Sequence, residues 1–364
     1  GLKIQTLHAY CERLLRQFPL EAGLPPGFET QDESEARALQ RACLTRLYAR
    51  ASADPGGEIA RAIAALLDLA GPSGPETLAG FVTAKRHRFG QALAQAGSPE
   101  ALMDRVSAAL GVPPSLSEAA AKADGWMETD PGDLEAAQSA YSAATSTQDI
   151  ERGDRLAVAL AAALLHPVHG FDAYCDFLLT GKGEFRKSFF TKKLGETYTI
   201  LRTLYGEEGS EIHRMRDEVL PRVRAASTNT LSRAAIRLGA ALLEDYETQL
   251  VQRRKVDFSD LVVRARGLLT DSDARDWTLY KLDRGLQHIL VDEAQDTAPD
   301  QWAVVDALSE EFFAGEGDTS DTVVRTVFCV GDEKQSIYSF QDADPRLFIA
   351  QGIRLHAQAD AAGI

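Results

Sequence analysis

Two short apolar runs, each ending in acidic residues, constrain the fold of this 364-residue chain more than any other feature. Gln287 to Val291 is followed by an Asp-Glu pair, and Val323 to Val330 is followed by Gly-Asp. A helical pattern from about Gln301 to Phe313 lies between them. A strand, a helix and a strand in this order favour a parallel pair with a right-handed crossover. Because ligands bind beyond the carboxyl ends of parallel strands, both acidic ends are expected to border one site.

The first acidic end has the residues that a phosphate-transfer site needs. Asp292 could hold Mg²⁺, which takes one or two carboxylates and keeps its waters. Glu293 could orient and deprotonate a water for attack on a γ-phosphate. An acidic turn after a strand explains the same pair without any chemistry, so the pair alone does not decide between the two.

The second acidic end opens the segment Val330 to Phe340, which holds an amide and two rings. Gln335 could sense a γ-phosphate, and Tyr338 and Phe340 could stack on unpaired bases, a contact that contributes roughly 1–3 kcal/mol per base. Two core aromatics at alternate strand positions are the competing interpretation.

A basic stretch stands out in an otherwise acidic chain. The formal net charge is −15, which argues against broad phosphate binding but leaves room for a local groove. Gly181 to Lys193 (GKGEFRKSFFTKK) has five basic residues against one Glu. These five are candidate DNA contacts: Lys182, Arg186, Lys187, Lys192 and Lys193. The alternative is a solvated loop whose lysines only aid solubility.

The two acidic ends, taken together as DEAQDT and GDEKQSIYSF, resemble motifs II and III of the UvrD/Rep/PcrA helicases of superfamily 1. Thr6-Leu7-His8-Ala9 resembles the TxHx DNA-contacting motif of that family, and Asp257 to Leu261 resembles its DFxDL segment. All four occur in family order. The opening TLHAYCERLLRQFPLEAGLPPGF, RKSFFTKK and a late Ala-Asp-Pro make the chain most similar to the AddA branch, the helicase-nuclease subunits of bacterial double-strand-break repair. Phe340-Gln341-Asp342-Ala343 departs from the usual aromatic-Arg-Gly-Ala and lacks its arginine.

The resemblance implies an α/β, helix-dominated fold. Residues 1–20 and 256–364 would form part of the first RecA-like P-loop NTPase motor domain, built on a parallel sheet, and residues 21–255 a large all-α insertion subdomain. It implies ATP and Mg²⁺ as cofactors, single-stranded DNA and duplex ends as ligands, and an AddB-type partner subunit. Thr6 and His8 would contact phosphates and share one groove with Tyr338 and Phe340.

The motif that would complete the nucleotide site does not occur in this sequence. GxxxxGK[ST] is not found, and Gly181-Lys182-Gly183 lacks the required order. We therefore expect a fragment of a longer protein, inactive alone, whose parent is an ATP-dependent DNA helicase. The alternative is a non-catalytic DNA-binding or partner-docking module. The second motor domain's arginine motifs and a PD-(D/E)xK nuclease cluster are also not visible.

The remaining sequence features favour a cytoplasmic protein. Four scattered cysteines show no CxxC spacing, which fits a reducing compartment rather than a zinc or disulfide framework. No window approaches 18 consecutive apolar residues, so no membrane span is expected.

Overall fold

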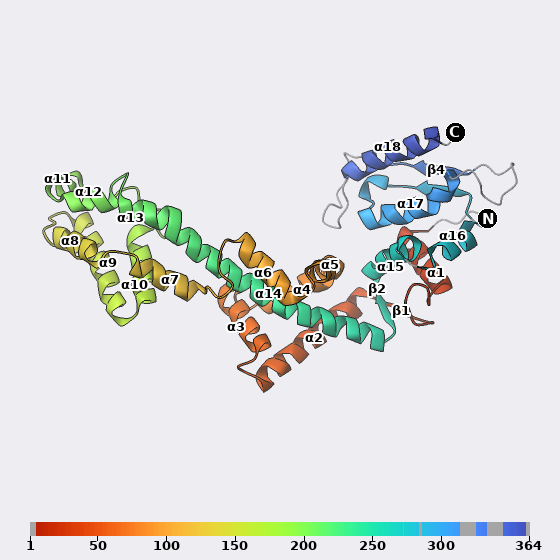
Figure 1. Ribbon diagram of the computed structural model, residues 1–364, viewed down its shortest axis with the longest axis horizontal. Coiled ribbons are helices and arrows are strands. Elements are labelled where there is room, and N and C mark those ends of the chain that lie inside the picture. Colours follow the sequence, from red (N-terminus) through yellow and green to blue (C-terminus); the bar gives the residue numbers. More distant parts are fainter. Residues whose placement is uncertain (1–4, 272, 284–285, 314–324, 333–344, 362–364) are drawn as a thin grey trace. The chain divides into compact units, whose positions relative to one another are not determined.

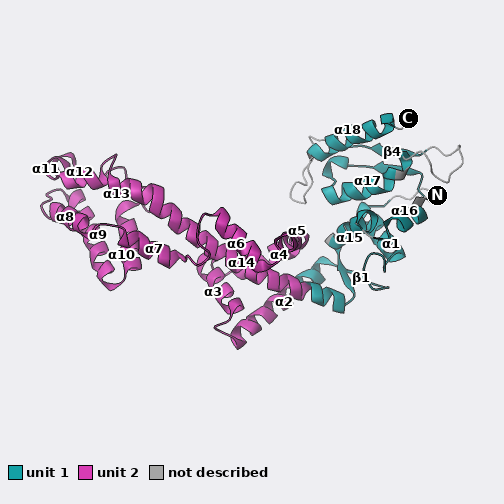
Figure 2. Cartoon of the chain, in the orientation of Figure 1, with its two compact units in different colours: residues 1–39, 247–364 teal, residues 40–246 magenta. Residues whose placement is uncertain are grey.

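The computed structural model describes residues 5–271, 273–283, 286–313, 325–332 and 345–361 (Figure 1). Helices dominate this part of the chain, as the sequence predicts, and the strands are short and parallel. The chain divides into two compact units (Figure 2), of which unit 1 comprises residues 1–39 and 247–364 and unit 2 comprises residues 40–246. Two helices, α2 (Glu33–Ala53) and α14 (Leu220–Gln252), run through the boundary between the units.

Unit 1 combines helices with two parallel strand pairs. Its remaining elements are α1 (Leu7–Gln17), β1 (Glu29–Gln31), β2 (Lys255–Asp257), α15 (Phe258–Thr270), α16 (Arg275–Asp283), β3 (His288–Val291), the 3-10 turn η2 (Ala294–Asp296), α17 (Pro299–Phe313), β4 (Thr326–Cys329) and α18 (Pro345–Ala361).

The strand–helix–strand unit predicted from the acidic-ended runs is confirmed. β3 pairs in parallel with β4, with Ile289 opposite Val327 and Val291 opposite Cys329, and α17 connects the two strands. The side chains of Ile289, Val291 and Cys329 pack against a small core around Trp302, which is 1% exposed. The strand ends are therefore fixed by apolar packing as well as by the ladder.

A second parallel pair joins the two ends of unit 1 in a way the hydrophobic pattern does not reveal. β1 pairs with β2, with Thr30 opposite Val256. β1 runs directly into α2, whose start is a capping box as expected. The Asp32 carboxylate accepts from the Glu35 N–H at 2.8 Å, and the Glu35 carboxylate accepts from the Asp32 N–H at 3.1 Å. Residues 29–35 consequently belong with unit 1.

Unit 2 is helical apart from one β-bridge in its described residues, between Leu179 and Phe185. Its elements besides α2 and α14 are α3 (Glu58–Ala70), α4 (Gly74–Ala84), α5 (Arg86–Ala96), α6 (Pro99–Ala109), α7 (Glu118–Met127), α8 (Pro131–Ser142), α9 (Thr147–Leu165), α10 (Pro167–Leu178), α11 (Lys192–Thr197), α12 (Thr199–Tyr205), α13 (Ser210–His213) and the π-helical turn η1 (Arg214–Val219).

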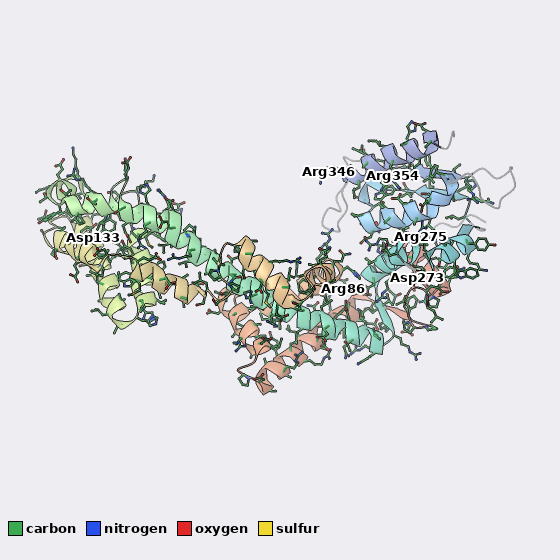
Figure 3. All side chains as sticks on the ribbon, viewed as in Figure 1. Arg86, Asp133, Asp273, Arg275, Arg346 and Arg354 are labelled. Atoms are coloured by element: carbon green, nitrogen blue, oxygen red, sulfur yellow. The ribbon has the colours of Figure 1, made fainter. Side chains whose placement is uncertain are left out.

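A buried arginine accompanies a helix break that the sequence periodicity does not show. The pattern from about 77 to 96 predicts one helix, but the chain breaks at Lys85, which has φ −116° and ψ 24°. Arg86, labelled in Figure 3, is 3% exposed and donates from Nη1 to the Thr83 carbonyl at 2.8 Å. Its guanidinium also lies over the ring of Tyr246. The break lets Arg86 point inward and satisfy its charge there.

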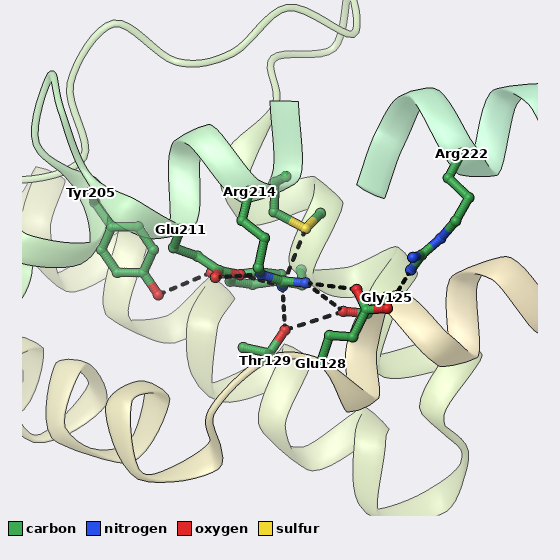
Figure 4. A network of polar contacts seen from close by, with 9 residues as sticks. Gly125, Glu128, Thr129, Tyr205, Glu211, Arg214 and Arg222 are labelled. Carbon is green, nitrogen blue, oxygen red and sulfur yellow. Dashed lines mark hydrogen bonds and ion pairs between the residues drawn. The ribbon is translucent and has the colours of Figure 1, made fainter. Parts of the chain in front are cut away.

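A polar network lies where α7, α13 and η1 meet (Figure 4). The Arg214 guanidinium donates to both Glu211 carboxylate oxygens, from Nε at 2.9 Å and Nη2 at 2.7 Å. It also donates to the Thr129 hydroxyl at 2.6 Å and the Gly125 carbonyl at 3.1 Å. The Glu211 side chain is only 8% exposed, so this pairing satisfies a carboxylate that is almost removed from water.

Candidate functional site

Asp292 and Glu293 follow the last residue of β3 and are exposed to solvent. The Asp292 Oδ1 atom accepts a hydrogen bond from the Glu293 N–H at 3.0 Å. Glu293 has φ 51° and ψ 42°, a left-handed conformation that is uncommon for a residue with a side chain and is often found at functional sites. The turn therefore presents two adjacent carboxylates at the carboxyl end of a parallel strand.

The ends of β3 and β4 meet, as their predicted parallel pairing requires. The Val330 N–H donates to the Val291 carbonyl at 2.8 Å, and the Ala294 N–H donates to the Val330 carbonyl at 2.9 Å. The Asp-Glu pair and the Gly331-Asp332 turn thus lie side by side, and Asp332 is exposed like the pair. The structure brings together the two acidic ends that the sequence places far apart.

Gln295 connects the two ends, and sequence reasoning assigned it no role. It is 1% exposed, and its Nε2 donates to the Glu293 Oε2 at 2.7 Å. Its Oε1 accepts from the Asp332 N–H at 3.0 Å. The only sequence signal is an amide two residues after the Asp-Glu pair, and that signal does not show burial.

The carboxylates retain acceptor capacity for a cation or a water. Among the described residues, Asp292 Oδ2 and Glu293 Oε1 have no hydrogen-bond partner. Carboxylate oxygens are the ligands that Mg²⁺ prefers, so Asp292 fits such an ion with its waters retained. Within the described ranges, no three His, Cys, Asp or Glu side chains converge as a metal-binding group.

Three candidate residues lie outside the described residues. Gln335, Tyr338 and Phe340 fall within 333–344, beyond the last described residue of the β4 end.

Thr6 and His8 occupy the beginning of α1, a helix that the sequence predicts from residue 8. The Thr6 hydroxyl accepts from the Ala9 N–H at 3.2 Å and caps the helix. The His8 ring stacks on Phe258, with ring centroids 4.3 Å apart and planes 9° from parallel. Burial lowers the pKa of His8, which favours its neutral form. The contact joins the TxHx-like segment to the DFxDL-like segment, although Phe258 itself remains 54% exposed.

The basic stretch connects α10 to α11 and is anchored by its aromatic and polar residues. Phe189 is 4% exposed in the unit 2 core, and its carbonyl accepts from the Tyr141 hydroxyl at 2.7 Å. The buried Asp149 carboxylate accepts from the Thr191 N–H at 2.9 Å and from the Thr191 hydroxyl at 2.6 Å. The four lysines of this stretch are exposed: Lys182, Lys187, Lys192 and Lys193.

Arg186 differs from these lysines because its guanidinium has protein partners. Its Nε donates to the Phe177 carbonyl at 3.0 Å and its Nη2 to the Asp176 carbonyl at 3.1 Å. It thereby satisfies carbonyls at the end of α10, where a helix leaves such groups unpaired. Burial and the nearby Arg155 and Arg152 charges lower the pKa of Arg186.

The family to which this site belongs follows from similarity along the whole chain. A family model described as the UvrD/REP helicase N-terminal domain matches residues 1–352, and the chain therefore belongs to this family. An ATP-dependent helicase/nuclease of the AddA type, from Desulforudis audaxviator, is 26% identical, and the alignment covers 99% of this chain. A protein of the same name from Exiguobacterium sibiricum is 27% identical over 95% of the chain. One from Staphylococcus haemolyticus is 37% identical over 31% of the chain.

These relatives confirm the resemblance to the AddA branch. They are much longer than this chain, which spans 30% of the Desulforudis audaxviator protein and 29% of the Exiguobacterium sibiricum protein. Among the described helices, none combines the length and apolar character needed to cross a membrane.

Proposed function

We propose that this chain contributes the carboxylate half of the ATP site in an ATP-dependent DNA helicase that acts in double-strand-break repair and recombination. The observation that carries the proposal is the position of Asp292 and Glu293 at the end of β3, beside the end of β4. Membership of the UvrD/REP family and the names of the relatives support the same activity.

In this proposal the two carboxylates have different tasks. Asp292 would hold Mg²⁺ through its exposed oxygens, and the ion when bound neutralises charge on the phosphates. Glu293 would orient the attacking water and accept its proton, with Oε1 available and Oε2 held by Gln295. Gln335 is proposed to sense the γ-phosphate. These groups act mainly by positioning and electrostatic stabilisation, which account for most of the catalysis in phosphoryl transfer.

We propose that residues 1–20 and 256–364 form part of a RecA-like motor domain and that residues 21–255 form an insertion subdomain. The parallel β3–β4 pair supports the first assignment, and the all-helical character of most of unit 2 supports the second. Because the sequence has no phosphate-binding GxxxxGK[ST] loop, the isolated chain should not hydrolyse ATP.

DNA would contact both units in this proposal. In unit 1, the exposed Thr6 and the His8–Phe258 stack support contacts to phosphates, and Tyr338 and Phe340 are proposed to stack on bases. In unit 2, the lysines of the basic stretch support sequence-independent phosphate contacts. The names of the relatives describe one component of a larger assembly, which supports an AddB-type partner for the parent protein.

The test uses the parent protein, meaning the full-length polypeptide that contains this chain. Glu293→Gln should leave ATP binding within a few-fold of wild type but lower hydrolysis by orders of magnitude, because the water loses its base. Asp292→Ala should weaken Mg²⁺-dependent binding instead. Near-normal hydrolysis by the Glu293→Gln parent would refute the assignment.

A second candidate function applies to the isolated chain. The ordered basic stretch with its exposed lysines favours a DNA-binding module that works without hydrolysis. DNA binding by the isolated chain without ATP turnover would support this interpretation for the chain, while the parent's ATPase is measured separately.

A further inference from the structure

Gln295 lies in a position that fixes the orientation of its amide group. A backbone N–H, that of Asp332, approaches one end of the amide, and the Glu293 carboxylate approaches the other. A backbone N–H must face an oxygen, and a carboxylate must face an NH₂ group. Only one orientation of the amide satisfies both partners, so the link between Glu293 and Asp332 has a defined direction.

The surroundings hold this side chain in place. Gln295 is buried, whereas the two residues it connects are exposed. A Cβ atom at Gly331 would lie 2.5 Å from Gln295 Oε1 and 3.0 Å from the Gln295 backbone nitrogen. Only a residue without a side chain permits this approach, so the turn after β4 presses directly on the amide.

The left-handed backbone of Glu293 adds a reason for such a support. A non-glycine residue in this region persists only where the surrounding structure stabilises it. The hydrogen bond from Gln295 restrains the Glu293 side chain on one oxygen and leaves the other available.

We propose that Gln295 is a positioning residue that aims the Glu293 carboxylate at the attacking water and ties its position to the backbone at the end of β4. This inference rests on the proposed function of Glu293. A shift of the Gly331-Asp332 turn would move the amide and, through it, the general base. Hydrolysis would thereby depend on the position of the chain that follows β4.

The test compares variants of the parent protein. Gln295→Met keeps the length of the side chain but removes both hydrogen bonds, and it should lower kcat at least about tenfold while the affinity for ATP stays within about threefold. The matched control is Gln301→Met, which removes a half-buried amide contact to the Ala298 N–H at the start of α17 and should leave kcat unchanged.

A double-mutant cycle distinguishes positioning from general support of the fold. If Gln295 acts through Glu293, adding Gln295→Met to Glu293→Gln should lower the residual rate no further. Wild-type kcat for Gln295→Met beside an inactive Glu293→Gln parent would overturn the positioning role and leave the proposed function intact. An active Glu293→Gln parent would overturn both.

A second measurement needs no folded Gln295 variant. In the ¹⁵N-labelled chain, the side-chain NH₂ protons of Gln295 should exchange with solvent at least about tenfold more slowly than those of the exposed Gln17, because they are buried against Glu293. Glu293→Ala should abolish this protection. Equal exchange of the Gln295 and Gln17 amides would contradict the hydrogen bond on which the inference depends.

Discussion

Replacing Arg214 tests whether the polar network of unit 2 stabilises the fold as strongly as its burial indicates. Arg214→Met removes the bidentate partner of Glu211, whose side chain is 8% exposed, while the Arg214 side chain itself is 18% exposed. Leaving a buried charge without its partner costs about 3–5 kcal/mol. The hydroxyl of Thr129 loses its partner in the same variant.

Urea unfolding of the chain, followed by circular dichroism, measures this loss. Arg222→Met is the matched control, because Arg222 pairs with Glu128 at a site where these side chains are 34% and 44% exposed. An exposed pair of this kind contributes about 0–1 kcal/mol. The double variant Glu211→Gln with Arg214→Met should recover part of the loss. Equal, small effects of Arg214→Met and Arg222→Met would refute the reasoning.

Two further predictions concern charge. Lys187→Gln with Lys193→Gln should weaken DNA binding uniformly across sequences and reduce the slope of log affinity against log salt by about 1.5, and an unchanged slope in fluorescence titrations would return these lysines to a solubility role. Burial lowers the pKa of His8, so the unfolded chain binds its proton more readily below about pH 6.5, and the free energy of unfolding should fall as the pH decreases through that range. His8→Phe preserves a ring on Phe258 and should flatten this dependence between about pH 7.5 and 5.5, whereas an identical pH dependence would contradict a buried neutral histidine.

Local patterns predicted the elements of the site because they depend on short-range chemistry. The apolar runs around Ile289 and Val327 identified a parallel pair, since each had the length of a strand and an acidic end. Asp32 and Glu35 predicted a capping box because its two hydrogen bonds lie within four residues.

Contacts between distant residues were the part that the sequence could not provide. The β1–β2 pair joins strands of three residues each that are far apart in the chain, and neither has a periodicity long enough to recognise. The role of Arg186 depends on the carbonyls of Asp176 and Phe177, so its charge alone suggested a DNA contact. Gln295 became a candidate only once its burial and its link to Asp332 were known.

ATP hydrolysis with and without single-stranded DNA, measured for the parent protein and for the isolated chain, tests the central claim most directly. The proposal predicts that DNA raises the parent's rate by at least about tenfold and that the isolated chain, without a phosphate-binding loop, shows no turnover. A parent whose hydrolysis does not respond to DNA, or an isolated chain that hydrolyses ATP as fast as the parent, would contradict it.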